Sequence, residues 1–356
     1  MLPFDEYMEA VLYAPGLGYY AAGNRKFGPG GDFVTAPELG PLFGQCLARE
    51  AGPVLASLNQ ACVLEFGAGS GALAVSLIEA LSALDQLPKR YCILEISPDL
   101  RERQRKRLEP IANQHGLDIE WLERMPEEPL QGVILANEVV DAFPVTRFRV
   151  VNGKPVRAGV CIDGDGFTWE WIDDLGDDQS TVDIVREHQL TDGYISEICP
   201  RATAWMGALA SALQQGVVLV IDYGFPAAEY YLPERSAGTL RCHYQHQAHN
   251  SPLIYPGIQD VTSHVNFSAL ADAGRESGLE VLGYTSQEAY LLGLGLLELA
   301  APQPNDDEKQ ILKTAAEVKE LILPSQMGEA FKVMAFGKQI DKPLQGFKLR
   351  DRSASL

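Results

Sequence analysis

The chain has 356 residues, of which 46% are hydrophobic and 22% charged, and this is the composition of a soluble globular protein rather than a disordered or fibrous one. The length fits one large domain or two ordinary ones. The formal net charge of −19 argues against a nucleic-acid-binding surface, because contacts to phosphates need clustered Lys and Arg. The same charge favours a cationic partner over an anionic membrane.

Targeting and metal-binding signals are missing from the sequence. The first residues, MLPFDEYMEA, have no signal or transit pattern, and the apolar stretch at 289–301 is too short and too rich in glycine to span a bilayer. The six cysteines include no CxxC pair, so neither a zinc site nor any other metal site is predicted. We therefore expect a cytoplasmic, bacterial-type protein with no membrane insertion.

Short apolar runs predict the central strands. They lie at 62–66, 91–95, 132–136 and 217–222. A helical pattern at 72–84 separates the first two runs, and a charged amphipathic pattern at 99–116 follows the second. This alternation predicts an α/β fold with a doubly wound, mostly parallel, Rossmann-like sheet.

Other stretches interrupt this rhythm. Alternating strand-like pieces with turn signals predict an inserted β-hairpin and substrate region at 146–200, and a second insertion at 225–266 is rich in aromatics but has little periodicity. The core would then comprise 61–145 and 201–338, with an N-terminal segment (1–60) over the cofactor site and a tail at 339–356. Within the core we expect helices at 202–216, 267–278, 287–300 and 306–323, and strands at 280–284 and 331–338.

The sharpest motif is LEFGAGSG, which lies between the first strand and the first helix. Its glycines, Gly67, Gly69 and Gly71, allow a tight turn and a close approach of the backbone to a ligand at a helix N-terminus. The spacing fits a dinucleotide such as NAD and also S-adenosylmethionine (SAM). Glu65 favours SAM, because its carboxylate would attract a cationic amino group and repel a pyrophosphate.

Glu95 ends the second predicted strand. A carboxylate at this position is placed to accept hydrogen bonds from both ribose hydroxyls of an adenosine group. Since NAD and SAM share that ribose, Glu95 indicates an adenosine-containing cofactor without choosing between the two.

Polar residues follow the next two core strands, where ligands of open α/β sheets bind. Asn137, Glu138 and Asp141 come after the third strand and are the candidate catalytic residues; Asp141 could instead cap the following turn. Two carboxylates there would suit an arginine acceptor, because the guanidinium stays protonated. Asp222 and Tyr223 end the fourth strand and, with His264, are the candidate substrate-binding residues.

Nine segments in order resemble the MidA family of SAM-dependent methyltransferases, which includes a mitochondrial methyltransferase that assists assembly of respiratory complex I. The segments are DEYMEAVLYAPGLGYY, GDFVTAPE, LEFGAGSGAL, YCILEISPDLRERQ, ANEVVDAFPV, VIDYGFP, GTLRCHYQH, DVTSHVNF and MGEAFKVMAF. The resemblance extends from about residue 4 to about residue 338. It implies a class I methyltransferase fold and, by analogy with the mitochondrial member, dimethylation of an arginine in a protein substrate.

The resemblance also implies roles for individual residues. It places SAM on the three motif glycines, the SAM ribose on Glu95, and Asn137 and Glu138 near the methyl donor. Asp32 and Thr35, in GDFVTAPE, would lie over the cofactor. Relatives commonly carry Asp where this chain has Asn266 in HVNF, and relatives usually have a helix before the PFDEYM motif with which this chain begins.

Three functions follow from different readings of these features. The first is a SAM-dependent methyltransferase acting on arginine in a protein, with a subunit of a respiratory complex as one candidate substrate. The second is an NAD(P)-dependent Rossmann oxidoreductase. The third is a SAM-binding assembly factor that acts mainly by holding a partner, for which the two insertions offer surfaces. The sequence leaves a homodimer open.

Overall fold

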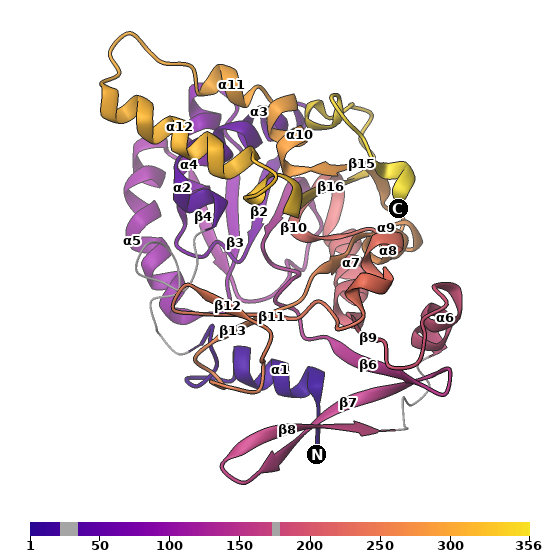
Figure 1. The fold of residues 1–356 in the computed structure, drawn as a ribbon. Helices are drawn as coiled ribbons and strands as arrows, with labels where there is room; N and C mark the ends of the chain where they lie inside the picture. Colours follow the sequence, from indigo (N-terminus) through magenta and orange to yellow (C-terminus); the bar gives the residue numbers. More distant parts are fainter. Residues whose placement is uncertain (22–34, 173–178) are drawn as a thin grey trace.

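The computed structural model describes residues 1–21, 35–172 and 179–356. Its core is a twisted sheet in the upper part of Figure 1. The strand order is β15 (Glu280–Ser286), β16 (Phe331–Lys338), β10 (Leu213–Phe225), β5 (Leu130–Asn137), β2 (Ala61–Phe66), β3 (Arg90–Leu94) and β4 (Asp118–Leu122), and β14 (Val265–Asn266) also pairs with β10. All pairs are parallel except the two that β16 forms. This confirms the predicted α/β fold with a mostly parallel sheet.

Helices cover both faces of the sheet because the strands are apolar on both sides. In β5, for example, Val133 and Leu135 pack into one core cluster, and Ile134 and Ala136 pack into the other. The first cluster contains residues of α3 (Leu42–Ala56), α4 (Ala72–Ala83), α5 (Pro98–His115), α10 (Gln287–Gly293), α11 (Leu296–Leu299) and α12 (Glu308–Ile322). The second contains residues of α7 (Pro200–Ala212) and α9 (Phe267–Glu276).

Two helix boundaries differ from the sequence prediction. The helix expected at 287–300 is divided into α10 and α11, because Gly295 between them adopts a left-handed conformation with φ of 77°. The helix expected at 202–216 ends at Ala212, and β10 begins at Leu213, which is already extended. The other core strands and helices lie close to their predicted positions.

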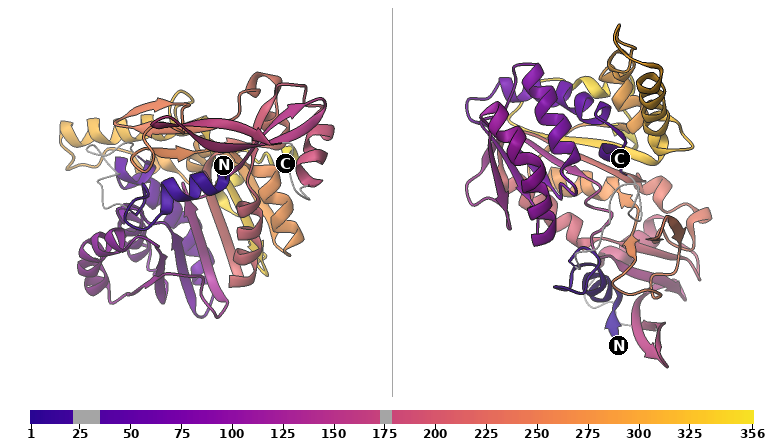
Figure 2. Two further views of the ribbon diagram at one scale, coloured as in Figure 1. Left: turned by 90° about the horizontal axis from the view of Figure 1, so that it is seen from below. Right: turned by 90° about the vertical axis from the view of Figure 1, so that its left-hand side faces the viewer.

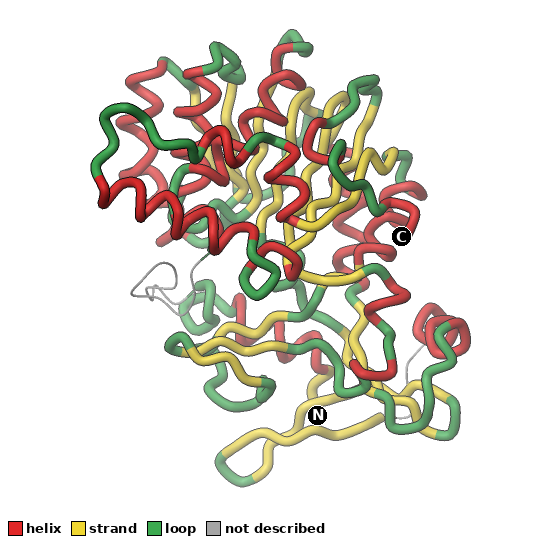
Figure 3. The backbone as a smooth tube through the Cα atoms, turned by 45° about the horizontal axis from the view of Figure 1, so that its top comes forward, coloured by secondary structure: helices red, strands yellow, loops and turns green. Residues whose placement is uncertain are grey.

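A lower lobe lies beyond the sheet, at the bottom of Figure 1. One of its sheets is antiparallel and consists of β1 (Leu2–Pro3), β6 (Thr146–Val151), β7 (Lys154–Asp163), β8 (Gly166–Ile172) and β9 (Ile195–Ile198). The helices α1 (Phe4–Tyr13) and α6 (Gln179–Glu187) accompany it. Figure 2 shows this lobe from two further sides. Figure 3 marks its strands in yellow.

The stretch 225–266 is more regular than the sequence suggested. It holds a second small sheet, in the order β12 (Gln247–His249), β11 (Arg241–Tyr244) and β13 (Asp260–Thr262), together with the short helix α8 (Ala227–Tyr230). The prediction missed these strands because runs of three or four residues are too short to reveal a period. The three-stranded sheet lies beside α1 in the lower lobe (Figure 1).

The ends of the chain are tied to the rest of the molecule. Leu2 and Pro3 pair with β7, so the N-terminus belongs to the lower lobe. The tail packs against α3, where the buried Glu50 carboxylate accepts hydrogen bonds from the main-chain N–H groups of Gln345 (2.7 Å) and Gly346 (2.8 Å). In the described ranges, no helix is long and apolar enough to cross a membrane.

Candidate active site

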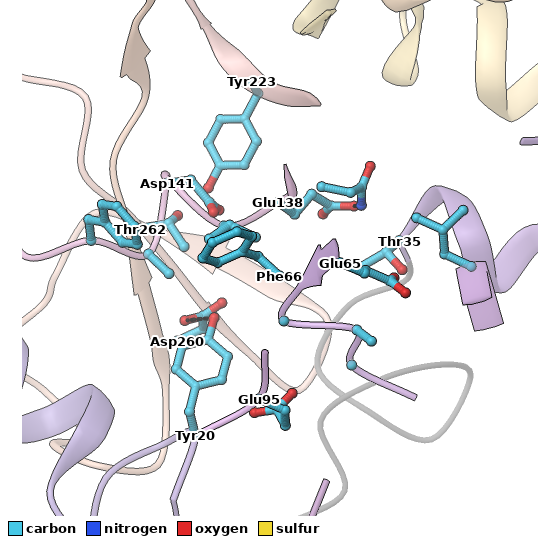
Figure 4. Close-up of a pocket in the computed structure, with 18 of the residues that line it drawn as sticks. Tyr20, Thr35, Glu65, Phe66, Glu95, Glu138, Asp141, Tyr223, Asp260 and Thr262 are labelled. Atoms are coloured by element: carbon cyan, nitrogen blue, oxygen red, sulfur yellow. Dashed lines mark hydrogen bonds between the residues drawn. The ribbon is translucent and has the colours of Figure 1, made fainter. Parts of the chain in front are cut away.

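A cavity of about 850 Å³ lies at the carboxyl ends of β2, β3, β5 and β10. Residues of the lower lobe also line it. Figure 4 shows part of its lining. One end is formed by the glycine-rich loop after β2 and by residues 94–96 at the end of β3. The other end is formed by the loop after β5, by Tyr223 and by one face of the β11–β13 sheet. We call these the cofactor end and the acceptor end, after the roles expected of their residues from the sequence.

The glycine-rich loop takes the conformation that the motif predicts. Gly67, Gly69 and Gly71 all have positive φ, at 57°, 54° and 81°. A Cβ on Gly67 would approach only Val139, at 3.7 Å, so glycine is needed there for its backbone conformation rather than for space. Gly67 and Gly69 line the cavity, whereas Gly71 is the N-cap of α4 behind it.

Glu65 and Glu95 both line the cofactor end, as the sequence predicts for a shared ligand. Glu65 is 3% exposed and accepts a hydrogen bond from the Tyr91 hydroxyl at 2.7 Å; burial raises its pKa to about 7. The Glu95 carboxylate accepts hydrogen bonds from Ser97 N (3.0 Å) and Gln104 Nε2 (3.1 Å). These bonds fix its orientation at the end of β3, where a ribose of a bound nucleoside would need an acceptor.

The segment before α3 reaches the cofactor end. Thr35 is the N-cap of α2 (Ala36–Leu39), and both Thr35 and Glu38 line the cavity. The Glu38 carboxylate accepts a hydrogen bond from the Ser70 hydroxyl in the glycine-rich loop, and Arg107 Nη1 donates to the same hydroxyl oxygen at 2.9 Å. Thr35 therefore lines the cavity. Asp32, which the resemblance also places over the cofactor, lies outside the described residues.

The candidate catalytic residues lie at the end of β5 and on the turn that follows it. Glu138 has φ of 53°, unusual for a residue other than glycine, and its N–H donates to the main-chain oxygen of Ile221 on β10 (2.9 Å). Asn137 Nδ2 donates to Glu138 Oε1 at 3.2 Å. Burial, and then the nearby Asp141 carboxyl, raises the pKa of Glu138 to about 8. Burial likewise raises the pKa of Asp141 to about 6.

Asp222 and Tyr223, predicted together as substrate-binding residues, face in different directions. Asp222 is fully buried and not part of the cavity lining; its carboxylate accepts hydrogen bonds from the N–H groups of Val140 (3.0 Å) and Asp141 (3.2 Å). It holds the turn rather than facing a ligand. Tyr223 does line the cavity, and its hydroxyl points at Asp141 in Figure 4.

Three lining residues that the sequence did not single out are Tyr13, Tyr20 and Asp260. Asp260 is 2% exposed, and its Oδ1 accepts a hydrogen bond from the Tyr20 hydroxyl at 3.0 Å (Figure 4). Tyr13 donates to the main-chain oxygen of Ala142 at 2.9 Å. The acceptor end therefore gathers three carboxyl groups, those of Glu138, Asp141 and Asp260. The segments DVTSHVNF and DEYMEAVLYAPGLGYY contain Asp260 and the two tyrosines, but nothing local marks them as site residues.

His264 and Asn266 have different positions relative to the cavity. His264 lines it, with its ring 5.3 Å from that of Tyr223, and burial lowers the pKa of His264 to about 4, so it is neutral at neutral pH. Asn266 is the N-cap of α9: its Oδ1 accepts a hydrogen bond from Ala269 N at 3.2 Å, and it is outside the cavity lining. Asp caps helices as well as Asn does, so this departure from relatives leaves the cap intact.

Comparison with known proteins identifies the family. A profile of S-adenosyl-L-methionine-dependent methyltransferases matches residues 46–285, more than half of the chain. The chain belongs to the MidA family of SAM-dependent methyltransferases. SAM is therefore its methyl donor, and the choice between SAM and NAD that the glycine motif left open is decided. The residues present fit that donor. They are the glycine-rich turn after β2, the buried Glu65 carboxyl on β2 and the Glu95 carboxylate, which hydrogen bonds hold at the end of β3.

Solved structures and curated proteins support the same family. A Burkholderia thailandensis protein bound to S-adenosyl-homocysteine is 42% identical over 100% of this chain and 92% of its own, with a TM-score of 0.95. The mitochondrial protein arginine methyltransferase NDUFAF7 homolog of Drosophila melanogaster is 28% identical, over 97% of this chain and 85% of its own. Human mitochondrial protein arginine methyltransferase NDUFAF7 is 26% identical, over 93% of this chain and 78% of its own.

Proposed function

We propose that the chain transfers methyl groups from SAM to an arginine side chain of a protein substrate. The observation that carries the proposal is the acidic acceptor end, where Glu138, Asp141 and Asp260 line one cavity. A guanidinium group is planar, stays protonated and offers five donors, so its best partners are carboxylates held in fixed positions. Three such groups in one cavity suit arginine better than a neutral hydroxyl acceptor.

We assign the two ends of the cavity to the two reactants. The loop at Gly67 and Gly69, with Glu65 and Glu95, would hold SAM, and Thr35 would lie beside it. Asn137 lines the same cavity and donates a hydrogen bond to Glu138. When bound, SAM supplies an electrophilic methyl group.

The chain's own residues would then position the acceptor. Glu138 and Asp141 would accept hydrogen bonds from the guanidinium N–H groups and so aim one nitrogen at the methyl group, which is the main requirement of this transfer. A bound cation favours the ionised form of both carboxyls, although burial raises their pKa values when no cation is present. The nitrogen loses one proton as it gains the methyl group, and we assign that proton to the Glu138 carboxylate.

The named activity of the mitochondrial relatives supports the arginine acceptor at 26–28% identity. We propose a subunit of a respiratory complex as one candidate substrate. The lower lobe would be the surface that holds this protein substrate. A cytoplasmic location and a homodimer are proposals too. Figure 1 shows that the lobe lies below the sheet.

The test uses the purified chain, SAM labelled in its methyl group, and protein extract from cells that lack the chain. Acid hydrolysis of the labelled protein should release methylated arginine. The matched variant, Glu138→Gln, should bind S-adenosylhomocysteine normally and transfer roughly 100-fold less label. Label in lysine, in a carboxyl ester or in small molecules alone would exclude the proposal.

A further inference from the structure

One face of the β11–β13 sheet forms a wall of the acceptor end. The two strands are antiparallel, with Arg241 opposite Thr262 and His243 opposite Asp260. All four of these residues line the cavity. Side chains alternate along a strand, so Cys242 and Val261, between them, point the other way and pack into the hydrophobic cluster that contains α1. The wall therefore carries a carboxylate and a guanidinium on the same face, in diagonal positions of the two strands.

Two guanidinium groups, Arg241 in the lining and Arg235 beside it, have only neutral hydrogen-bond partners in the described part of the chain. Arg241 Nη1 donates to Asn250 Oδ1 at 2.7 Å, and Arg235 Nη1 donates to the main-chain oxygen of Glu229 at 2.6 Å. Neither forms an ion pair with a carboxylate of a described residue, although the whole chain has a net charge of −19. By contrast, the nearby Lys332 lies 3.9 Å from the Glu329 carboxylate.

Both guanidinium groups lie near the same part of the lining. Arg235 stacks on the ring of Phe225, with 3.8 Å from its guanidinium carbon to the ring centre, and the Phe225 ring is 5.2 Å from that of His264. The charges of Arg235 and Arg241 both add to the effect of burial in lowering the pKa of His264. Phe225 and His264 line the cavity themselves. The positive charges of Arg235 and Arg241 thus lie beside the part of the cavity that holds the three carboxyl groups.

We propose that Arg235 and Arg241 form an anion subsite that binds an acidic side chain of the protein substrate, close in sequence to the arginine that is methylated. This inference rests on the proposed function. Arg241 is diagonal to Asp260 across the strand pair. The Cα atoms of residues in this relationship are about 7–8 Å apart. Two residues of an extended chain span about 6.8 Å. For an arginine whose guanidinium contacts Asp260 as well as Glu138 and Asp141, this match gives a preferred substrate with Asp or Glu two positions from the arginine.

The test measures binding of short labelled peptides by fluorescence anisotropy, with S-adenosylhomocysteine present. One peptide has Arg followed two positions later by Glu, and its partner has Gln there; both have blocked ends. The wild type should bind the Glu peptide about five- to tenfold more tightly. In the double variant Arg235→Gln, Arg241→Gln the ratio should fall to about one, whereas Arg186→Gln, an exposed arginine on α6, should keep it.

Further arms fix the source of the negative charge. Arg241→Glu should reverse the preference, so that a peptide with Lys at the same position binds better than the Glu peptide. Thermal unfolding of each variant shows that it is folded. A neutral peptide that ends in a free carboxylate two positions after the arginine tests a chain terminus; tight binding of this peptide alone would contradict a side-chain site.

Equal binding of the Glu and Gln peptides by the wild type would overturn the inference, and so would a preference that survives in the double variant. The proposed function fails in a different way. If the Glu peptide binds with the expected preference but gains no methyl group on arginine, the subsite stands and arginine methylation does not. If both peptides are methylated equally, arginine methylation stands and the subsite does not.

Discussion

The fully buried carboxylate of Asp222 accepts a hydrogen bond from the main-chain N–H of Asp141 at 3.2 Å. The same oxygen accepts a second bond, from Val140 N at 3.0 Å, and the other carboxylate oxygen accepts one from Tyr223 N at 2.9 Å. One side chain at the end of β10 therefore fixes the turn that carries Glu138 and Asp141. We infer that Asp222 positions the acceptor-binding residues and does not touch the substrate.

Asp222→Ala should lower the rate of methyl transfer roughly 100-fold, because the turn would lose the bonds that set its position. The affinity for S-adenosylhomocysteine, measured by calorimetry, should change much less, since Glu65 and Glu95 are held by hydrogen bonds outside this turn. Asp222→Asn keeps one acceptor oxygen, so its rate of methyl transfer should lie between those of the wild type and Asp222→Ala. A loss of cofactor binding in parallel with the rate would point to general damage instead.

Glu138→Gln should stabilise the ligand-free protein in a pH-dependent way. Burial raises the pKa of Glu138 from its ordinary value of 4.5 to about 8, so the folded state holds a proton that the unfolded state has lost. That stability is complete below about pH 4.5 and is lost as the pH rises through about 8. Glutamine stays neutral throughout.

Thermal unfolding therefore distinguishes the two proteins. The melting temperature of Glu138→Gln should rise relative to the wild type between about pH 5 and pH 8, and the difference should then level off. The matched control Glu102→Gln, which removes an exposed carboxyl paired with Lys106 on α5, should give a difference that hardly varies with pH. A flat difference for Glu138→Gln would mean that its carboxyl is already ionised at neutral pH.

Glu95→Ala should weaken binding of S-adenosylhomocysteine about 10- to 100-fold, because the bound ribose would lose a charged acceptor. Calorimetry measures this directly, with Glu102→Ala as the surface control. Wild-type affinity in Glu95→Ala would show that the ribose is held elsewhere.

Asn266→Asp should leave both activity and stability close to those of the wild type, because Asp satisfies the same N-cap of α9. Asn266→Ala should cost about 1 kcal/mol in the free energy of unfolding. Urea denaturation compares the three proteins. A gain in methyl transfer for Asn266→Asp would instead give this position a role in acceptor binding.

The cofactor end could be predicted from sequence because its parts are local. The glycines follow one strand and Glu95 ends the next, so the strand and helix pattern alone brings them to one edge of the sheet. The acceptor end could be predicted only in part. Glu138 and Asp141 were found at a strand end, but Asp260 comes from a strand of three residues in another lobe, and only the tertiary fold brings it to Tyr20.

Asp222 illustrates a different limit. Its place at the end of a core strand was predicted, yet the direction of its carboxylate depends on the turn after β5, which is distant in sequence. The same applies to Arg241 and His243: they alternate with Cys242, but a four-residue strand gives too few positions to separate a cavity-facing side from a buried one.

Methylation of arginine in a protein substrate is the activity that we propose for this chain. The most direct measurement is mass spectrometry of arginine methylation across the proteome of three strains, which carry the wild-type chain, Glu138→Gln or no chain. The account predicts at least one arginine site that is methylated only with the wild-type chain and that has Asp or Glu two positions away. Identical arginine methylation in all three strains, despite SAM binding by the purified protein, would contradict it.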